Sequence, residues 1–207
     1  MSYPPSQMIN RWEHRPEPNP GQGQLYWHVL FQDEPRLQAL ASLAQEKLSS
    51  FPGLDLTPKR WLHLTVMVAG IAEEFVEPDL KEMVAQAHQL LSSVPPITVT
   101  FGKVLYHPEA VLLGVRSAGA LAPVYRAVRD ATRNVKRETA ATGHDHWIPH
   151  VTLAYSTAVQ PLGPIIAALG HELPRCEVTI RHVSLVIQEG PERLWDWQSI
   201  AEIPLLV

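Results

Sequence analysis

Hydrophobic and polar residues alternate along several short segments of this chain, and apolar residues recur at helical spacing in the longer segments between them. The alternation predicts strands at residues 25–31, 61–68, 97–104, 110–115, 147–155, 178–187 and 195–203. The helical spacing predicts helices at residues 35–50, 78–92, 121–138 and 161–169. A β-α-β-α-β unit therefore occurs twice, which indicates an internal structural duplication.

The first 24 residues differ from the rest in composition. They hold Pro4, Pro5, Pro16, Pro18 and Pro20, together with Gly21 and Gly23. This composition predicts an extended or mobile N-terminal arm over residues 1–24. Residues 25–207 form a single domain in this interpretation, with lobes at about 25–109 and 110–207, and the pattern leaves open whether the lobes exchange strands.

Overall composition describes a globular protein, with 45% hydrophobic and 18% charged residues and a net charge of -4. This charge disfavours a protein that coats nucleic acid, but not one that binds a nucleotide or one RNA end. The single cysteine, Cys176, rules out an internal disulfide and is typical of a reducing compartment. Because no apolar run approaches the roughly 20 residues that span a bilayer, we expect a cytoplasmic monomer with no membrane partner.

Two of the predicted strands carry the same short pattern. Their sequences are Leu62-His63-Leu64-Thr65-Val66 and Pro149-His150-Val151-Thr152-Leu153. Side chains alternate across a strand, so a histidine and a threonine share one face while the apolar residues share the other. The pattern predicts two strands that each back onto a core and front a cleft. Two imidazoles and two hydroxyls suffice for acid–base chemistry at a phosphodiester.

A third triplet, His182-Val183-Ser184, also fits the pattern, and with 10 histidines in the chain a chance match is expected. The place of each triplet within the repeated unit distinguishes the two motifs from the third triplet. His63 and His150 lie 87 residues apart at equivalent points of the two units, whereas His182 aligns with a different strand. We therefore interpret the third triplet as a coincidence.

The paired motifs resemble those of the two-histidine (2H) phosphoesterase superfamily, specifically its bacterial 2'-5' RNA ligase/cyclic phosphodiesterase branch. The similarity includes the glycine after the first motif, Gly70, and the proline before the second histidine, Pro149. It implies a bilobal α+β fold in which two antiparallel sheets with flanking helices are related by a pseudo-twofold axis around a central cleft. It also implies catalysis without a metal or cofactor.

Hydrolysis of a 2',3'-cyclic phosphate needs a base for the attacking water and an acid for the leaving oxygen, and imidazole serves either role near neutral pH. We expect His150 to act as the base and His63 as the acid. Thr65 and Thr152 would donate hydrogen bonds to the non-bridging phosphate oxygens. Run in reverse, the same pair joins a cyclic phosphate end to a 5'-hydroxyl, so 2'-5' ligation is the opposite direction of one mechanism.

Six further residues are candidates for substrate binding: Lys59, Arg60, Tyr26, Trp61, Trp147 and Tyr155. The two cations precede the first motif and suit an anionic ligand. Tyr26 and the two tryptophans offer faces on which a base can stack. Relatives often carry an arginine shortly after the second motif, where this chain has Tyr155 and Ser156, and alternation places Tyr155 in the core instead.

Several alternatives stay open at this point. Arg126, Arg129, Arg133, Lys136 and Arg137 form a basic stripe on one predicted helix, which is either a phosphate contact or, more simply, a solvated face. His144, Asp145, His146 and His150 have spacing compatible with a zinc site. A nucleotide-binding module with little turnover is the alternative to an enzyme. RNA ends, cyclic nucleotides and 2'-5' oligonucleotides all suit the predicted chemistry.

Overall fold

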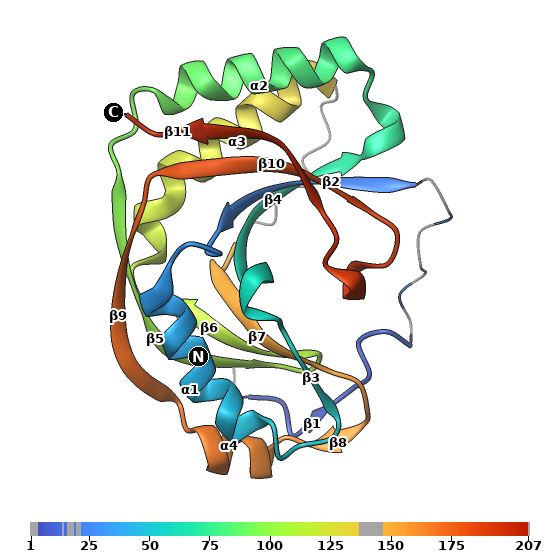
Figure 1. Cartoon of the computed structure of the whole chain (residues 1–207), viewed down its shortest axis with the longest axis vertical. Helices are drawn as coiled ribbons and strands as arrows, with labels where there is room; N and C mark the ends of the chain where they lie inside the picture. Colours follow the sequence, from blue (N-terminus) through green and yellow to red (C-terminus); the bar gives the residue numbers. More distant parts are fainter. Residues whose placement is uncertain (1–3, 14, 16–18, 20–21, 137–146, 207) are drawn as a thin grey trace.

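A computed structural model describes residues 4–13, 15, 19, 22–136 and 147–206 of the chain (Figure 1). Four α-helices lie within these residues: α1 (Pro35–Leu48), α2 (Glu77–Leu91), α3 (Ala122–Lys136) and α4 (Gly163–Leu169). The strands are β1 (Gln7–Met8), β2 (Gly23–Leu30), β3 (Leu54–Leu56), β4 (His63–Ile71), β5 (Ile97–His107), β6 (Ala110–Val115), β7 (His150–Ser156), β8 (Gln160–Pro161), β9 (Glu172–Ile180), β10 (His182–Glu189) and β11 (Gln198–Pro204).

The main strands form two antiparallel four-stranded sheets that meet along β4 and β7. The first has the order β11-β10-β2-β4 and the second the order β7-β6-β5-β9, with β3 added beside β7. In the described part of the chain one register pair, Leu64 and Val151, links the two sheets into a continuous strand order. Beyond this pair the two motif strands diverge, which opens a space between them. The antiparallel sheets and flanking helices confirm the predicted α+β fold.

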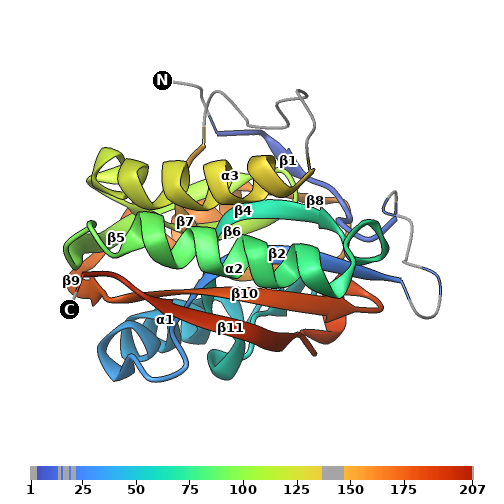
Figure 2. The same cartoon turned by 90° about the horizontal axis from the view of Figure 1, so that it is seen from above.

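Each sheet draws strands and helices from both halves of the chain, so a boundary near residue 109 does not separate the two lobes. β5 follows the first motif strand in sequence but pairs with β6 in the second sheet, whereas β10 returns to pair with β2. Helices α2 and α3 lie side by side on the first sheet (Figure 2), and α1 packs with α4 on the second. The two lobes are therefore interleaved through the whole sequence.

The strand predicted over residues 178–187 is wrong as a single element. It consists of two strands, β9 and β10, that break at Arg181 because the chain passes there from one sheet to the other (Figure 1). Three short strands, β1, β3 and β8, also went unpredicted. Pairs or triplets of residues are too short to show an alternating pattern, and they pair only because other segments lie beside them.

The motif strands also begin and end differently from the prediction. A 3₁₀ turn over Lys59–Trp61 precedes the first motif, so His63 is the first residue of β4. His150 likewise begins β7. The first motif strand also runs past its predicted end at residue 68, because β4 continues to Ile71 through Gly70 at φ 148°. Each histidine is therefore the first residue of its strand, where its ring can reach the space between the sheets.

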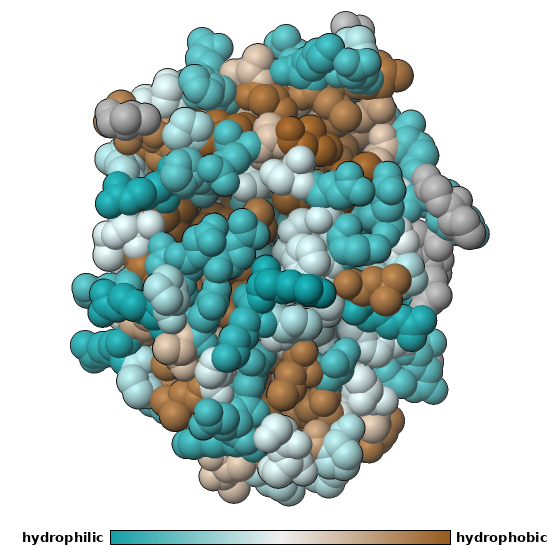
Figure 3. Space-filling view, in the orientation of Figure 1, coloured by the Kyte–Doolittle hydropathy of each residue, from teal (hydrophilic) through white to brown (hydrophobic). Residues whose placement is uncertain are grey.

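The apolar faces of the strands and helices form one large core. Leu64 and Val151, at the junction of the sheets, are both fully buried. Trp27 is fully buried as well, and its Nε1 donates a hydrogen bond of 2.9 Å to Thr132 Oγ1 on α3. Cys176 is a buried free cysteine on β9. On the surface, apolar side chains gather along the seam between α2 and β11 while polar ones cover much of the same face (Figure 3).

The described part of the N-terminal segment packs against the domain, so an extended or mobile arm is the wrong description of it. β1 pairs with β8, and the side chain of Met8 is fully buried in the core. The backbone N–H of Arg11 donates to the carbonyl of Ser156 at 2.9 Å. This segment is therefore fixed to the end of β7. No helix in the described part of the chain is both long and apolar enough to cross a membrane.

Candidate functional site

A cleft of about 1070 Å³ lies between the two sheets. Its walls include His63 and Thr65 from β4 and His150 and Thr152 from β7, so the structure brings the four motif residues into one space. Leu64 is buried and absent from the cleft wall, as the alternation predicts, whereas Val66 is buried but also lines the cleft, at a register shift between β2 and β4. Thr152 is 7% exposed and lies deeper than the two histidines, which are partly exposed.

The two motif histidines are held in the same way. His63 Nδ1 lies 2.8 Å from the carbonyl oxygen of Trp61, and His150 Nδ1 lies 2.7 Å from the carbonyl oxygen of Ile148. Because a carbonyl oxygen only accepts, each Nδ1 carries the hydrogen. This fixes the tautomer of the neutral ring and leaves Nε2 as the nitrogen available for proton transfer. The two sites share one geometry across the duplication.

His63 has the more enclosed position of the two histidines. Trp197 meets its ring edge-on at 4.7 Å between centroids, and the ring of His28 lies 4.4 Å away. Burial, with a smaller contribution from His150, lowers the pKa of His63 to about 4. Burial also lowers the pKa of His150. Both rings are therefore neutral near neutral pH.

Sequence reasoning missed two further imidazoles in the described part of the cleft wall, His28 and His107, of which His28 lies next to His63. His28 lies on β2 opposite Thr65 of β4, is 3% exposed and stacks on Tyr26 at 5.0 Å. Its Nδ1 is buried without a hydrogen-bond partner. Burial and the adjacent His63 keep its pKa well below the ordinary value. The shared parity of Tyr26 and His28 on a strand next to the first motif was the available signal.

Tyr155 is buried, as alternation predicts, but on the cleft side and not in the main core. The cause is a β-bulge: Val111 pairs with Ala154 and Leu112 with Thr152, so Leu153 has no partner on β6. One extra residue reverses which face the following side chains occupy. Tyr155 therefore lines the cleft at 6% exposure, packed with Trp195.

The remaining substrate-binding candidates divide into two groups. Tyr26 and Trp147 line the cleft, and Trp147 stacks on Tyr125 of α3 at 5.1 Å while its Nε1 donates to the Thr65 carbonyl at 3.1 Å. Lys59, Arg60 and Trp61 are absent from the cleft wall: the two cations are exposed, and Trp61 packs against Trp197. The 3₁₀ turn that precedes β4 directs this segment away from the cleft.

The cations that line the cleft in the described residues are Arg11 and Arg15, which the sequence did not point to, and Lys136, which belongs to the basic stripe of α3. Each is paired with a carboxylate: Lys136 with Glu74, and both arginines with Glu109 and Glu192. Arg11 also places its guanidinium 4.3 Å from the centre of the Tyr155 ring. These arginines come from a segment whose sequence shows no periodic pattern, so no local signal pointed to the cleft.

Two further hypotheses gain little from the structure. Among its described residues the basic stripe on α3 contributes Lys136 to the cleft wall, while Arg129 pairs with its neighbour Asp130 at 2.9 Å. Arg137, His144, Asp145 and His146 lie outside the described residues. Within residues 4–13, 15, 19, 22–136 and 147–206 no three His, Cys, Asp or Glu side chains gather as a metal site.

Known proteins share this architecture. A family model described as the 2'-5' RNA ligase superfamily matches residues 31–192. The structure of TT0787 from Thermus thermophilus superposes with a TM-score of 0.67 at 19% identity, covering 88% of this chain and 97% of that one. E. coli LigT complexed with ATP gives 0.61 at 16% identity, with coverages of 90% and 99%. The PDE domain of MHV ns2 gives 0.58 at 12% identity, with coverages of 81% and 99%. No curated protein is similar enough in sequence to match the chain.

Proposed function

This chain belongs to the 2'-5' RNA ligase superfamily, and from that premise we propose that it is a metal-independent phosphodiesterase acting on 2',3'-cyclic phosphate or 2'-5' linkages. The observation that carries the proposal is the matched pair of histidines. Both rings line one cleft, and both hold Nδ1–H against a carbonyl so that Nε2 is free for proton transfer. Two imidazoles in one cleft supply the acid and the base that hydrolysis of a phosphodiester requires.

The surroundings of the histidines favour His63 as the base in hydrolysis, the reverse of the assignment expected from the sequence. A base must be neutral before it accepts a proton, and burial holds the pKa of His63 at about 4. His150 Nε2 would then donate its proton to the leaving ribose oxygen. An anionic phosphate bound between the rings raises the pKa of both, which makes a protonated His150 accessible in the complex.

The threonines complete the proposed reaction centre. Thr65 and Thr152 lie two residues after the histidines on the same strands and line the same cleft. Their hydroxyls would donate to the non-bridging oxygens, where negative charge concentrates in the transition state. Donors of this kind stabilise the transition state more than the ground state, so they act chiefly on kcat.

A nucleotide is the ligand class best supported for the cleft. Tyr26, Trp147 and Trp197 offer aromatic surface in its wall, and stacking on a base is sequence-tolerant. E. coli LigT has been crystallised with 3'-AMP, with ATP, with NADP+ and with phosphate. The reverse of the same reaction would join a cyclic phosphate end to a 5'-hydroxyl, so 2'-5' ligation belongs to the proposal.

The test is a product assay on 2',3'-cyclic nucleotides and 2'-5'-linked dinucleotides, with His63→Ala and His150→Ala beside the wild type. Each variant should lose about 10²–10⁴-fold in kcat while circular dichroism shows an intact fold. The matched control is His182→Ala, which replaces the exposed histidine of the third triplet on β10. A folded variant that keeps wild-type turnover would refute the two-histidine mechanism. Saturable nucleotide binding with no product would instead identify a binding module.

A further inference from the structure

Two arginines of the N-terminal segment join carboxylates from opposite lobes. Arg11 places Nη1 2.8 Å from Glu109 Oε2 and Nη2 2.7 Å from Glu192 Oε1. Arg15 contacts the same two carboxylates at 3.3 Å each. All four side chains line the cleft. We refer to Arg11, Arg15, Glu109 and Glu192 as the clasp.

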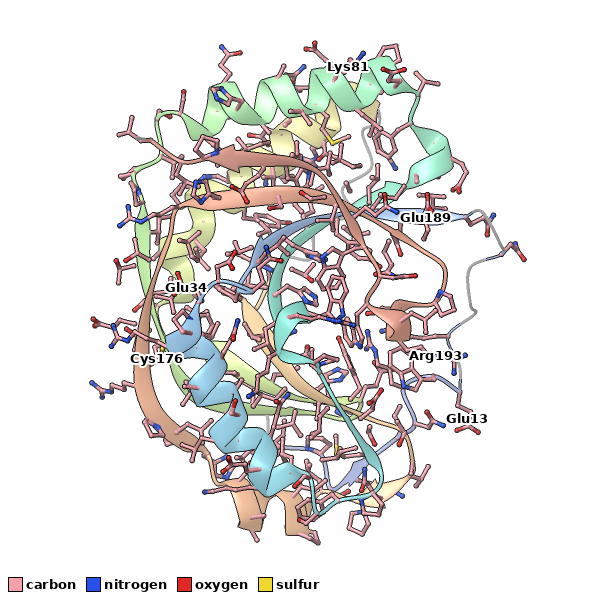
Figure 4. All side chains as sticks on the ribbon, viewed as in Figure 1. Glu13, Glu34, Lys81, Cys176, Glu189 and Arg193 are labelled. Carbon is pink, nitrogen blue, oxygen red and sulfur yellow. The ribbon has the colours of Figure 1, made fainter. Side chains whose placement is uncertain are left out.

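The two carboxylates of the clasp belong to different sheets. Glu109 lies in the turn between β5 and β6 of the second sheet, and Glu192 lies in the 3₁₀ turn Glu192–Leu194 between β10 and β11 of the first. Glu13, two residues after Arg11, lies on the same side of the molecule as Arg193 of that turn (Figure 4). The arginines therefore connect the lobes at a point away from their single strand pairing.

Arg11 is held firmly where it forms these contacts. Its side chain is 11% exposed, its guanidinium rests on the ring of Tyr155, and its backbone N–H donates to Ser156. The ion pairs of Arg11 are therefore screened less than pairs in open solvent, and removing one partner leaves the other charge poorly compensated. Arg15 is 48% exposed, so its two pairs resemble ordinary surface pairs, which contribute at most about 1 kcal/mol each, and Arg11 carries most of the strength of the clasp.

The Glu192 end of the clasp belongs to the loop that encloses His63. Trp195 follows three residues later in the left-handed conformation, at φ 55° and ψ 30°, and stacks on Tyr155 at 5.4 Å. A bulky side chain adopts this conformation only where its surroundings hold it there. Trp197 then meets His63 edge-on at 4.7 Å. The positions of both tryptophans thus depend on a loop that Arg11 and Arg15 hold through their ion pairs with Glu192.

We propose that Arg11 and Arg15 are positioning residues for the reaction at His63, and that they act by tying the Glu192 loop to Glu109 across the cleft. The inference rests on the proposed function. Both residues precede the segment matched by the family model, which begins at residue 31. The N-terminal segment is therefore part of the active site in this chain, through contacts that the two motifs do not supply.

The competing role for these arginines is direct contact with the substrate phosphate, and the carboxylates distinguish the two roles. If the arginines act through the clasp, Glu109→Gln/Glu192→Gln should lower kcat in the same way as Arg11→Gln/Arg15→Gln. If the arginines bind phosphate, removing the competing carboxylates frees them and should lower KM. Only the clasp makes both double variants defective.

The experiment is steady-state kinetics of both double variants and of the quadruple variant on a 2',3'-cyclic nucleotide. We expect each double variant to lose up to about 100-fold in kcat with a much smaller change in KM, and the quadruple variant to lose no more than either. Arg116→Gln, which breaks the Arg116–Glu172 ion pair outside the cleft, is the matched control and should keep full turnover. A rise in KM alone for the arginine variant, or faster turnover after removal of the carboxylates, would overturn the proposal.

A second measurement does not depend on turnover. Titration of the His63 ring by NMR reports how well the loop excludes water. The titratable groups that act on the pKa of this ring are Glu192 and His150 on β7, and the ring of His28 on β2 packs against it at 4.4 Å. Arg11→Gln/Arg15→Gln should raise the pKa of His63 from about 4, because water enters and the Glu192 charge loses its partners. An unchanged titration in a folded variant refutes the clasp. If the wild type turns over no phosphodiester while the titration moves, the proposed function fails and the clasp stands.

Discussion

Burial of His63 should make the folded protein lose stability as the pH falls through the weakly acidic range. The pKa of this ring is lowered from the ordinary 6.5 to about 4. Between these two values the unfolded chain binds a proton that the folded protein does not, so the free energy of unfolding rises with pH in this window. Each pKa unit corresponds to about 1.4 kcal/mol, so the ring accounts for about 3 kcal/mol that is present above pH 6.5 and lost by pH 4.

The perturbation that isolates this contribution is His63→Asn. Linkage puts the share of His63 between pH 7 and pH 5 at about 1.8 kcal/mol, a range that lies above the ordinary titration of carboxylates. His28, His150 and His107 also have lowered pKa values and act in the same direction, so the wild type should lose more than this share and the variant should keep the part that belongs to these three rings.

Urea denaturation at pH 7.0, 6.0 and 5.0 measures the slopes for both proteins. His88→Asn, which replaces an exposed histidine on α2, controls for the loss of an imidazole as such. The reasoning is refuted if the stability of His63→Asn falls with pH as steeply as that of the wild type, because the ring would then titrate alike in the folded and unfolded chains.

Three further outcomes follow from the same structure. Thr65→Val and Thr152→Val should each lower kcat about 100-fold at nearly constant KM, and steady-state kinetics with an unchanged kcat would remove the hydroxyls from the mechanism. Leu64→Ala should lower the free energy of unfolding by about 2–5 kcal/mol, because Leu64 is fully buried at the junction of the sheets. Urea denaturation measures this loss, and a loss below about 1 kcal/mol would show that the junction repacks freely. Thr132→Val should lower the free energy of unfolding by about 1–3 kcal/mol, because Trp27 Nε1 loses its hydrogen-bond acceptor inside the core. Unchanged stability in urea denaturation would mean that the indole finds another acceptor.

Local pattern was enough to find the four α-helices and most of the longer strands, including the two motif strands. His63 and Thr65 face the cleft while Leu64 is buried behind them, because alternation along a strand depends only on neighbouring residues. The four α-helices lie where their apolar spacing predicts them, with ends shifted by a few residues. Pairing of the motifs at equivalent points of the duplication identified the residues proposed for catalysis.

Contacts between distant segments decided the rest. The chain breaks between β9 and β10 at Arg181 because it passes there from one sheet to the other, and no sequence pattern near this residue predicts the break. The bulge at Leu153 turned Tyr155 toward the cleft, since a bulge is a mismatch between two paired strands and not a property of one. His28 acquired its burial from Tyr26, His63 and Trp197.

The cations that line the cleft show most clearly the difference between what local sequence predicts and what tertiary contacts decide. Lys59 and Arg60 stand next to the first motif in sequence yet lie outside the cleft wall, whereas Arg11 reaches it from a proline-rich segment. The sequence by itself determined which side chains face which side of each strand, because that periodicity is set by backbone geometry within a few residues. Only the tertiary structure decided which charges and rings meet at the cleft, because packing unites residues such as Arg11 and Glu192 that are 181 positions apart.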